Sequence, residues 1–241
     1  MRLTGKGCLP YPLKLVTVFL KPAGQRLGND VLLGKGAVFP GSLTLRGKLF
    51  TVARMAVRIA FVNGKGGVGK TTCSLLFAAA LLDAGKSVSI NDCDPQGNAT
   101  SAAIHLGIPQ GNAGQDIIVV DTAPNLDHPA TIETIKTADL VVLVTTPDAP
   151  DLSTTLATSR IIKTLRSGKT VLLFNRVVPN TYEFNAMPRM AEAIPFPRLP
   201  HYLTFLRAYP RAHLHGWKAL QPNSRIAAIE VARDILLSLN S

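Results

Sequence analysis

The sequence predicts an α/β fold: a doubly wound, mostly parallel β-sheet with helices on both faces. Two observations carry this prediction. Short, almost continuous apolar runs recur at 57–62, 87–91, 117–121, 140–145 and 170–174, as expected for parallel strands buried on both sides. Helical stretches are expected between them, near 70–84, 129–137 and 151–166, and the first ends at Gly85, where a left-handed cap belongs. Strands that alternate with helices favour a parallel sheet.

The first 54 residues differ in character from the rest of the chain. They contain nine Lys and Arg against a single acid, Asp30, and so hold a formal charge of +8 out of the total of +11. We interpret 1–54 as a basic leader rich in Gly and Pro, and 55–241 as the folded domain. Three origins of the leader stay open: an extension upstream of a native start at Met55, a disordered basic arm, or an organelle transit peptide. Because the leader holds most of the charge, the overall basicity does not by itself indicate DNA binding.

A Gly-rich segment follows the first predicted strand. Residues 64–72 read GKGGVGKTT and match the pattern G-x-x-x-x-G-K-[ST] between a strand and a helix. Glycines let such a loop curl so that its backbone N–H groups face phosphate oxygens. The pattern predicts an ATP and Mg²⁺ site in which Lys70 reaches the β- and γ-phosphates and Thr71 ligates the metal. The cofactor-binding residues expected here are Gly66, Gly67, Val68, Gly69, Lys70, Thr71 and Thr72.

The form K-G-G-x-G-K-T-T, with Lys65 and Thr72 added to the general pattern, resembles the deviant Walker A box of the ParA/MinD superfamily of P-loop ATPases, closest to small ParA-type partition ATPases. The resemblance implies a P-loop NTPase fold and an ATP-bound homodimer. It further implies that Lys65 is catalytic and reaches across the dimer to the phosphates of the partner subunit. A cation supplied in this way stabilises phosphoryl-transfer charge only after the dimer has formed.

Acidic residues follow two of the predicted strands. Asp121 ends the run 117–121 and is expected to hold Mg²⁺. The segment 92–97, DCDPQG, is similar to the switch I motif of the superfamily. That similarity implies that Asp94 positions the attacking water and that Asp92 supports the metal shell. Asn175, after the last predicted strand, resembles the base-side position of the family and is a candidate adenine contact, with a plain strand-end turn as the alternative.

Basic and aromatic residues interleave near the C-terminus. We expect non-specific DNA contacts there, with a solvated basic face and core aromatics as the alternative. The candidate DNA-binding residues are Arg198, Arg207, Arg211, Lys218 and Arg225, and the aromatics between them are Tyr202, Phe205, Tyr209 and Trp217. The closing helix, from Arg225, places 226, 229, 232 and 236 on one face, which predicts a helix packed on the core. Its mixed-charge polar side argues against a membrane anchor.

Taken with the resemblance, these features predict an ATPase that dimerises on ATP, binds DNA non-specifically and positions a plasmid, chromosome or other cargo. The resemblance implies weak hydrolysis stimulated by a ParB-like adaptor protein, in the cytoplasm at the nucleoid. Two alternatives stay open: a membrane-associated positioning ATPase of MinD type, and a nucleotide-binding protein without hydrolysis. The second is kept because only 18 residues separate Gly97 from Asp116, fewer than in most ParA proteins. The three cysteines form no CxxC pair, which argues against an iron–sulfur branch and favours a reducing compartment.

Overall fold

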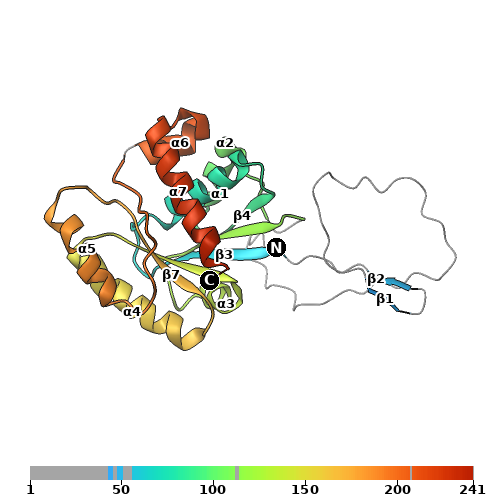
Figure 1. Cartoon of the computed structure of the whole chain (residues 1–241), viewed down its shortest axis with the longest axis horizontal. Coiled ribbons are helices and arrows are strands. Elements are labelled where there is room, and N and C mark those ends of the chain that lie inside the picture. The colour runs from blue at the N-terminus through green and yellow to red at the C-terminus, as the bar shows by residue number, and fades with distance from the viewer. Residues whose placement is uncertain (1–42, 46–47, 51–55, 112–113, 207, 241) are drawn as a thin grey trace, which may run out of the picture. The chain divides into compact units, whose positions relative to one another are not determined.

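The computed structural model describes residues 43–45, 48–50, 56–111, 114–206 and 208–240. The centre of the folded domain is a five-stranded parallel sheet with the strand order β4-β5-β3-β6-β7 (Figure 1). The predicted α/β fold is therefore confirmed, and each predicted strand is present within two residues of its expected bounds. The strands are β3 (Val57–Val62), β4 (Val88–Cys93), β5 (Ile117–Thr122), β6 (Leu140–Thr145) and β7 (Thr170–Phe174).

Helices cover both faces of this sheet (Figure 1). One face packs against α1 (Lys70–Asp83), α2 (Asn98–Leu106), α6 (Ala208–His215) and α7 (Pro222–Ser238), with the 3₁₀ turn η1 (Trp217–Ala219) between the last two. The other face packs against α3 (Pro129–Thr137), α4 (Ala149–Leu165) and α5 (Tyr182–Glu192). Gly85, beyond the end of α1, has a φ of 70°, so the left-handed turn expected there is present.

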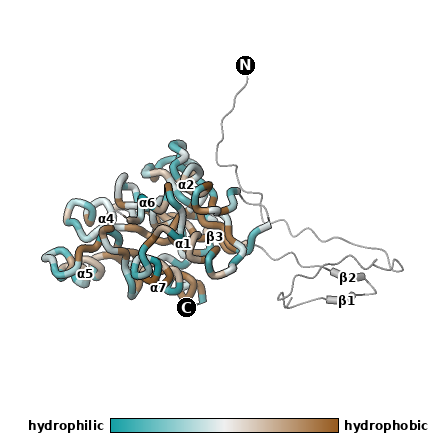
Figure 2. The backbone as a smooth tube through the Cα atoms, turned by 90° about the horizontal axis from the view of Figure 1, so that it is seen from above, coloured by the Kyte–Doolittle hydropathy of each residue, from teal (hydrophilic) through white to brown (hydrophobic). Residues whose placement is uncertain are grey.

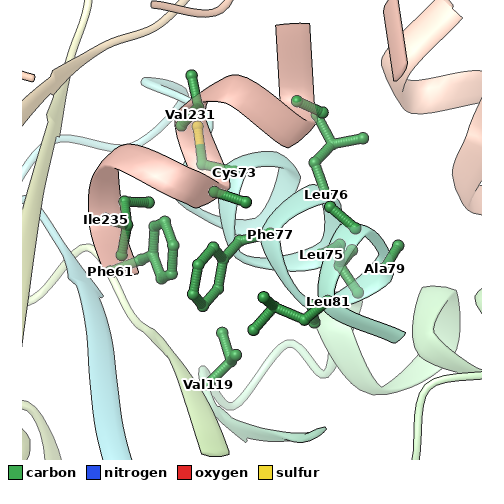
Figure 3. Packing of buried hydrophobic residues seen from close by; sticks show 14 of the residues in the cluster. Phe61, Cys73, Leu75, Leu76, Phe77, Ala79, Leu81, Val119, Val231 and Ile235 are labelled. Carbon is green, nitrogen blue, oxygen red and sulfur yellow. The ribbon is translucent and has the colours of Figure 1, made fainter. Parts of the chain in front are cut away.

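Alternation along the strands sends side chains into two separate cores. On β3, Ile59 and Phe61 enter the α1/α7 core, whereas Ala60 and Val62 enter the α4/α5 core. In the first core the ring of Phe61 packs against that of Phe77 from α1, with centroids 5.7 Å apart (Figure 3). Because both sides are covered, the strands form the hydrophobic centre of the domain, and polar residues lie mostly on helices and loops (Figure 2).

The last helix, α7, packs on the core as predicted, but two of the four residues predicted to face the core do not. Ile226 and Ile229 are 52% and 45% exposed. The predicted Ala232 is buried and Leu236 packs against the core, and the rest of the buried side is formed by Ala228, Val231 and Ile235. Small alanines let α7 approach α1 closely, and a buried carboxylate fixes the rotation of the helix: Asp234 Oδ2 lies 2.8 Å from His201 Nδ1 and accepts the backbone N–H of His201 at 3.0 Å.

Irregular segments pair with both outer strands of the sheet. Beside β4, the Ile90 N–H donates to the Pro109 carbonyl and the Gly111 N–H donates to the Ile90 carbonyl, both at 2.9 Å. Besides helix α2, the short connection from β4 to β5 therefore contains one β-bridge, between Gln110 and Ile90. Beside β7, residues 197–205 pair with the strand and its continuation through bridges at Leu172 and Val177. Both outer strands thus satisfy part of their backbone hydrogen bonding.

The leader contains one described feature. β1 (Leu43–Leu45) and β2 (Lys48–Phe50) form an antiparallel pair in which Leu43 lies opposite Phe50. The rest of 1–54 lies outside the described residues, so the interpretation of the leader stays a prediction. Among the described helices, none combines the length and apolarity needed to cross a membrane.

Candidate nucleotide-binding site

The Gly-rich loop lies at the carboxyl end of β3, the central strand, and leads directly into α1. Gly67 and Gly69 have φ values of 83° and 92°, and Val68 between them is buried. Alternation of left-handed and ordinary backbone makes successive N–H groups converge on one point, which is the geometry of an anion-binding nest. No side chain of the described residues caps α1, so its first N–H groups are available to phosphate oxygens. This is the arrangement that the motif predicts.

Lys70, the first residue of α1, turns back over the loop. Its Nζ donates to the Lys65 carbonyl at 3.2 Å, and the residue is buried. Burial lowers the pKa of Lys70, whereas the carboxylates of Asp121 and Asp94 raise it. An ammonium held inside an anion-binding loop and close to two acids is placed to bind the terminal phosphates of a nucleotide.

Thr71 and Asp121, the residues predicted to hold the metal together with Asp92, lie beside each other at the loop. The Thr71 hydroxyl donates to Asp121 Oδ2 at 2.7 Å, at the end of β5. Burial raises the pKa of Asp121 to about 7, partly offset by the hydrogen bond from Thr71. Asp121 Oδ1 is also buried and has no hydrogen-bond partner among the described residues. A buried carboxylate oxygen without a partner beside a hydroxyl fits a hard divalent cation such as Mg²⁺, bound directly or through water.

The two other predicted acids hold the turn between β4 and α2. Asp92 accepts the backbone N–H groups of Asp94 at 3.0 Å and of Thr100 at 2.8 Å, one on each carboxylate oxygen. Asp94 is half-buried and accepts the N–H of Gln96 at 3.0 Å. Asp92 thus shapes the segment that carries Asp94, and its predicted role in the metal shell stays a prediction. The charge of Asp94 is close enough to raise the pKa of both Lys70 and Asp121.

Lys65, the additional lysine of the loop, forms an ion pair with Asp151 in the first turn of α4. Asp151 is buried, and its second oxygen accepts the Thr146 hydroxyl at 2.7 Å. In this conformation the lysine is held within its own chain. The predicted contact with a partner subunit therefore requires this ion pair to open.

Helix α4 also holds the entry to the loop, a feature that the sequence analysis missed. Asn63 Nδ2 donates to Thr155 Oγ1 at 3.0 Å and to the Val144 carbonyl at 2.7 Å. The Gly64 N–H donates to Thr158 Oγ1 at 3.2 Å. Positions 151, 155 and 158 share one side of a helix, and all three contact residues 63–65. One signal in the sequence could have indicated this contact. Polar residues recur at helical spacing, at 151, 155 and 158, on the side of the helix that should be buried against the sheet.

Asn175 lies under the loop, at the end of β7. It is 3% exposed, and its Nδ2 donates to the Val68 carbonyl at 2.8 Å. Its predicted contact with adenine stays a prediction. The next residue, Arg176, has a left-handed φ of 56°, and its guanidinium carbon lies 5.9 Å from the centroid of the Phe205 ring.

A cavity of about 340 Å³ adjoins Thr71, between α2 and α6. Asn98, Ser101 and His105 line it from α2, and His213 lines it from α6. Burial lowers the pKa of His213. Within the described ranges, no group of three or more His, Cys, Asp or Glu could hold a metal ion. Sequence analysis did not find this cavity, because it arises from two helices more than 100 residues apart.

The predicted DNA-binding residues are only partly grouped by the structure. Arg198, Arg211 and Lys218 are exposed, on the segment beside β7, on α6 and on η1. Arg225 is half-buried on α7, and Arg207 lies outside the described residues. Of the interleaved aromatics, Tyr209 and Trp217 are buried in the core and Tyr202 packs edge-on against Phe184. Only Phe205 among them is exposed, so for most of these aromatics the core interpretation is correct.

Known proteins share both the sequence pattern and the fold. Residues 59–200 match the family model for the CobQ/CobB/MinD/ParA nucleotide binding domain. The maintenance of carboxysome distribution protein A of Gloeobacter kilaueensis is 34% identical over 205 residues, which span 73% of this chain and 90% of that protein. The sporulation initiation inhibitor protein Soj of Bacillus subtilis is 46% identical over 89 residues, 31% of this chain and 34% of that protein.

Solved structures are similar in fold at low sequence identity. MinD from Pyrococcus horikoshii in complex with Mg-ADP superposes with a TM-score of 0.59 at 16% identity, covering 75% of this chain and 96% of that one. An ATP complex of McdA from Cyanothece superposes with a TM-score of 0.60 at 13% identity, covering 76% of this chain and 97% of that one. At this identity the likeness establishes the fold.

Proposed function

This chain belongs to the CobQ/CobB/MinD/ParA nucleotide-binding family, and from that membership we propose that it is a ParA-type ATPase that positions cargo inside the cell. The observation that carries the proposal is the loop 64–72, in which Lys65 and Lys70 flank an anion-binding nest next to Thr71 and Asp121. The similarity to a carboxysome-distribution protein, 34% identity over 90% of that protein's length, supports the positioning of cargo as the function of the ATPase.

Nucleotide binding follows from the geometry. The N–H groups of 66–70 would surround the phosphates of ATP, with Lys70 on the terminal ones. Thr71 and Asp121 would hold Mg²⁺, which when bound neutralises charge on the β- and γ-phosphates. Asp121 would bind the cation as a carboxylate, so metal binding would release the proton that burial favours there.

Hydrolysis would depend on a second subunit. Asp94 would position the attacking water. Lys65 would leave Asp151 and reach the phosphates of the partner subunit, where its charge stabilises the transition state. Turnover would be slow in the monomer because this cation is held elsewhere, and we propose that a ParB-like adaptor protein stimulates it.

The ATP-bound homodimer would then bind DNA without sequence preference, in the cytoplasm at the nucleoid. The described contact residues would be Arg198, Arg211, Lys218 and Arg225, because phosphate contacts need exposed or partly exposed cations. If these four residues neutralise phosphates on both subunits of the dimer, affinity should fall by about ten-thousandfold between about 50 and 200 mM salt.

The test is retention of the full-length protein on random-sequence DNA with and without Mg-ATP, at several salt concentrations. We expect retention only with Mg-ATP and a steep loss with salt. Lys70→Ala is the matched control, since it removes the phosphate-binding ammonium while every DNA candidate stays. Wild-type protein that shows no heat of binding with Mg-ATP in calorimetry would refute the proposal.

One observation favours a second candidate function, a membrane-associated ATPase of MinD type. The outer side of α7 exposes Ile226, Ile229 and Leu237, with the exposed Arg233 between them. An apolar stripe with a basic residue suits the surface of an anionic bilayer. Pelleting with anionic liposomes that requires ATP, together with no retention on DNA, would support this candidate against the first.

A further inference from the structure

We infer that Asn175 is a positioning residue for phosphate binding: its side-chain amide holds the Val68 carbonyl away from the nest, so that the loop presents N–H groups to the phosphates. The inference rests on the proposed nucleotide binding. It differs from the adenine contact that the sequence predicts for the same residue.

Asn175 is firmly fixed. It is 3% exposed at the end of β7, and its own N–H donates to the Thr145 carbonyl of β6 at 2.7 Å. From there its Nδ2 reaches the Val68 carbonyl at 2.8 Å, across 107 residues of sequence. A buried amide in a hydrogen bond of this length has little freedom to turn toward another acceptor. Through Asn175, the carboxyl end of the sheet therefore supports the loop.

Val68 is the residue at which such support matters. It lies between Gly67 and Gly69, both left-handed, and its side chain is 1% exposed in the core. The side chain anchors Val68 from one side, and Asn175 holds its carbonyl. If that carbonyl turned inward, its partial negative charge would face the phosphates and one N–H would be lost from the nest.

The contact also accounts for glycine at position 69. A Cβ built on Gly69 would overlap Asn175 Nδ2, in addition to the strain of a φ of 92°. Loop and amide are therefore packed together, and neither can shift without the other. The consequence is that a change at Asn175 should be felt by any ligand that uses the nest, whether or not the ligand carries a base.

This consequence separates the two roles of Asn175. A base contact affects ATP but not inorganic tripolyphosphate, which has the phosphates alone. A support of the nest affects both. Calorimetric titration of the full-length protein with ATP and with tripolyphosphate, each with Mg²⁺, therefore decides between them. The variant is Asn175→Ala, and the control is Asn185→Ala on the exposed side of α5.

We expect Asn175→Ala to lower the affinity for ATP and for tripolyphosphate by a similar factor, about tenfold, as for loss of a buried hydrogen bond. Asn185→Ala should bind both as wild type does. A lower affinity for ATP with an unchanged affinity for tripolyphosphate would overturn the inference in favour of a base contact. Unchanged affinity for both ligands would overturn either role. Wild-type protein that binds neither ligand would instead refute the proposed function.

A second variant guards against a folding defect, which circular dichroism would reveal. Asn175→Asp keeps the shape but places a carboxylate oxygen against the Val68 carbonyl at neutral pH. When that carboxyl is protonated it can donate again. The affinity of Asn175→Asp for tripolyphosphate, divided by that of wild type at the same pH, should therefore recover as pH falls from 8 to 5. A ratio that does not change with pH would contradict the inference.

Discussion

Lys65 and Asp151 form an ion pair that joins the nucleotide-binding loop to the first turn of α4 within one chain. The lysine is one of the two residues, with Thr72, that this loop adds to the general P-loop pattern, and the ion pair holds it within its own chain. Because Lys65 is about one third exposed, water weakens the attraction. The pair therefore suits a contact that forms and opens.

The first prediction concerns this pair. Asp151→Asn removes the charge that retains Lys65, so the ATP-dependent dimer should form at a few-fold lower protein concentration. Size-exclusion chromatography with light scattering, with and without Mg-ATP, measures the shift. Asp148→Asn, at the exposed N-cap of the same helix, is the control and should leave dimerisation unchanged. A weaker dimer in Asp151→Asn would show that Asp151 serves the dimer itself.

The second prediction concerns Asp94. Asp94→Ala should still bind Mg-ATP, because Lys70, Thr71 and Asp121 are intact, but phosphate release should fall by tenfold or more, as for loss of a general base or water-positioning group. The protein should then remain on DNA after unbound ATP is washed away. Phosphate release and DNA dissociation measured on the same preparation provide the check. Unchanged turnover would mean that Asp94 does not position the water.

The third prediction concerns pH and Asp121, whose pKa burial raises to about 7 from an ordinary 3.8. The folded state holds this proton more tightly than the unfolded state, so the contribution of Asp121 to stability is fully present below about pH 4. It is lost as pH rises toward 7, by up to about 4 kcal/mol without metal. Asp121→Asn should flatten that part of the pH dependence in urea unfolding.

Mg²⁺ should act in the opposite direction at the same residue. The cation needs the carboxylate, so Mg-ATP affinity should rise from pH 6 to pH 8 as Asp121 gives up its proton. Calorimetry in two buffers of different ionisation enthalpy would count the proton released. Affinity that does not vary over this range would exclude Asp121 as the titrating metal-side group.

The fourth prediction concerns the support of the loop by α4. Thr155→Val leaves one Asn63 amide donor without this partner in a fully buried position, so the free energy of unfolding should fall by about 1–3 kcal/mol. Thr164→Val, on the exposed side of the same helix, should change it by less than about 0.5 kcal/mol. Equal effects of the two variants in urea unfolding would show that the buried hydrogen bond contributes little.

The fold and the loop could be predicted from sequence because their signals are local. Between 57 and 83 the sequence contains an apolar strand, the nine-residue Gly-rich loop and a helix, one directly after the other. The structure contains β3, the loop and α1 in that order. The position of Asp121 beside the loop could be predicted for the same reason, since Asp121 ends an apolar strand. Neighbouring parallel strands bring such ends together at one edge of the sheet.

The parts that sequence analysis missed depend on distant partners. Asp151, Thr155 and Thr158 contact residues more than 80 positions away, and their helical spacing does not indicate which distant residues they contact. Ile226 and Ile229 of α7 were wrongly predicted to face the core because hydrophobicity alone ranked them above Ala228. The His201–Asp234 hydrogen bond and close packing on α1 decided the rotation instead. Both errors concern side-chain orientation within correctly predicted elements.

All six side chains of β6 are buried: the five aliphatic ones are divided between the two cores, and the Thr145 hydroxyl lies 2.8 Å from that of Thr155. No side chain of this strand can therefore take part in recognition at the surface. Only substitutions that preserve the buried side-chain volume should be tolerated there. We therefore expect differences in recognition between related chains to lie in the loops at the carboxyl edge of the sheet and on the outer helix surfaces. Strand β6, next to the central strand β3, is then a constant part of the fold that carries those variable surfaces.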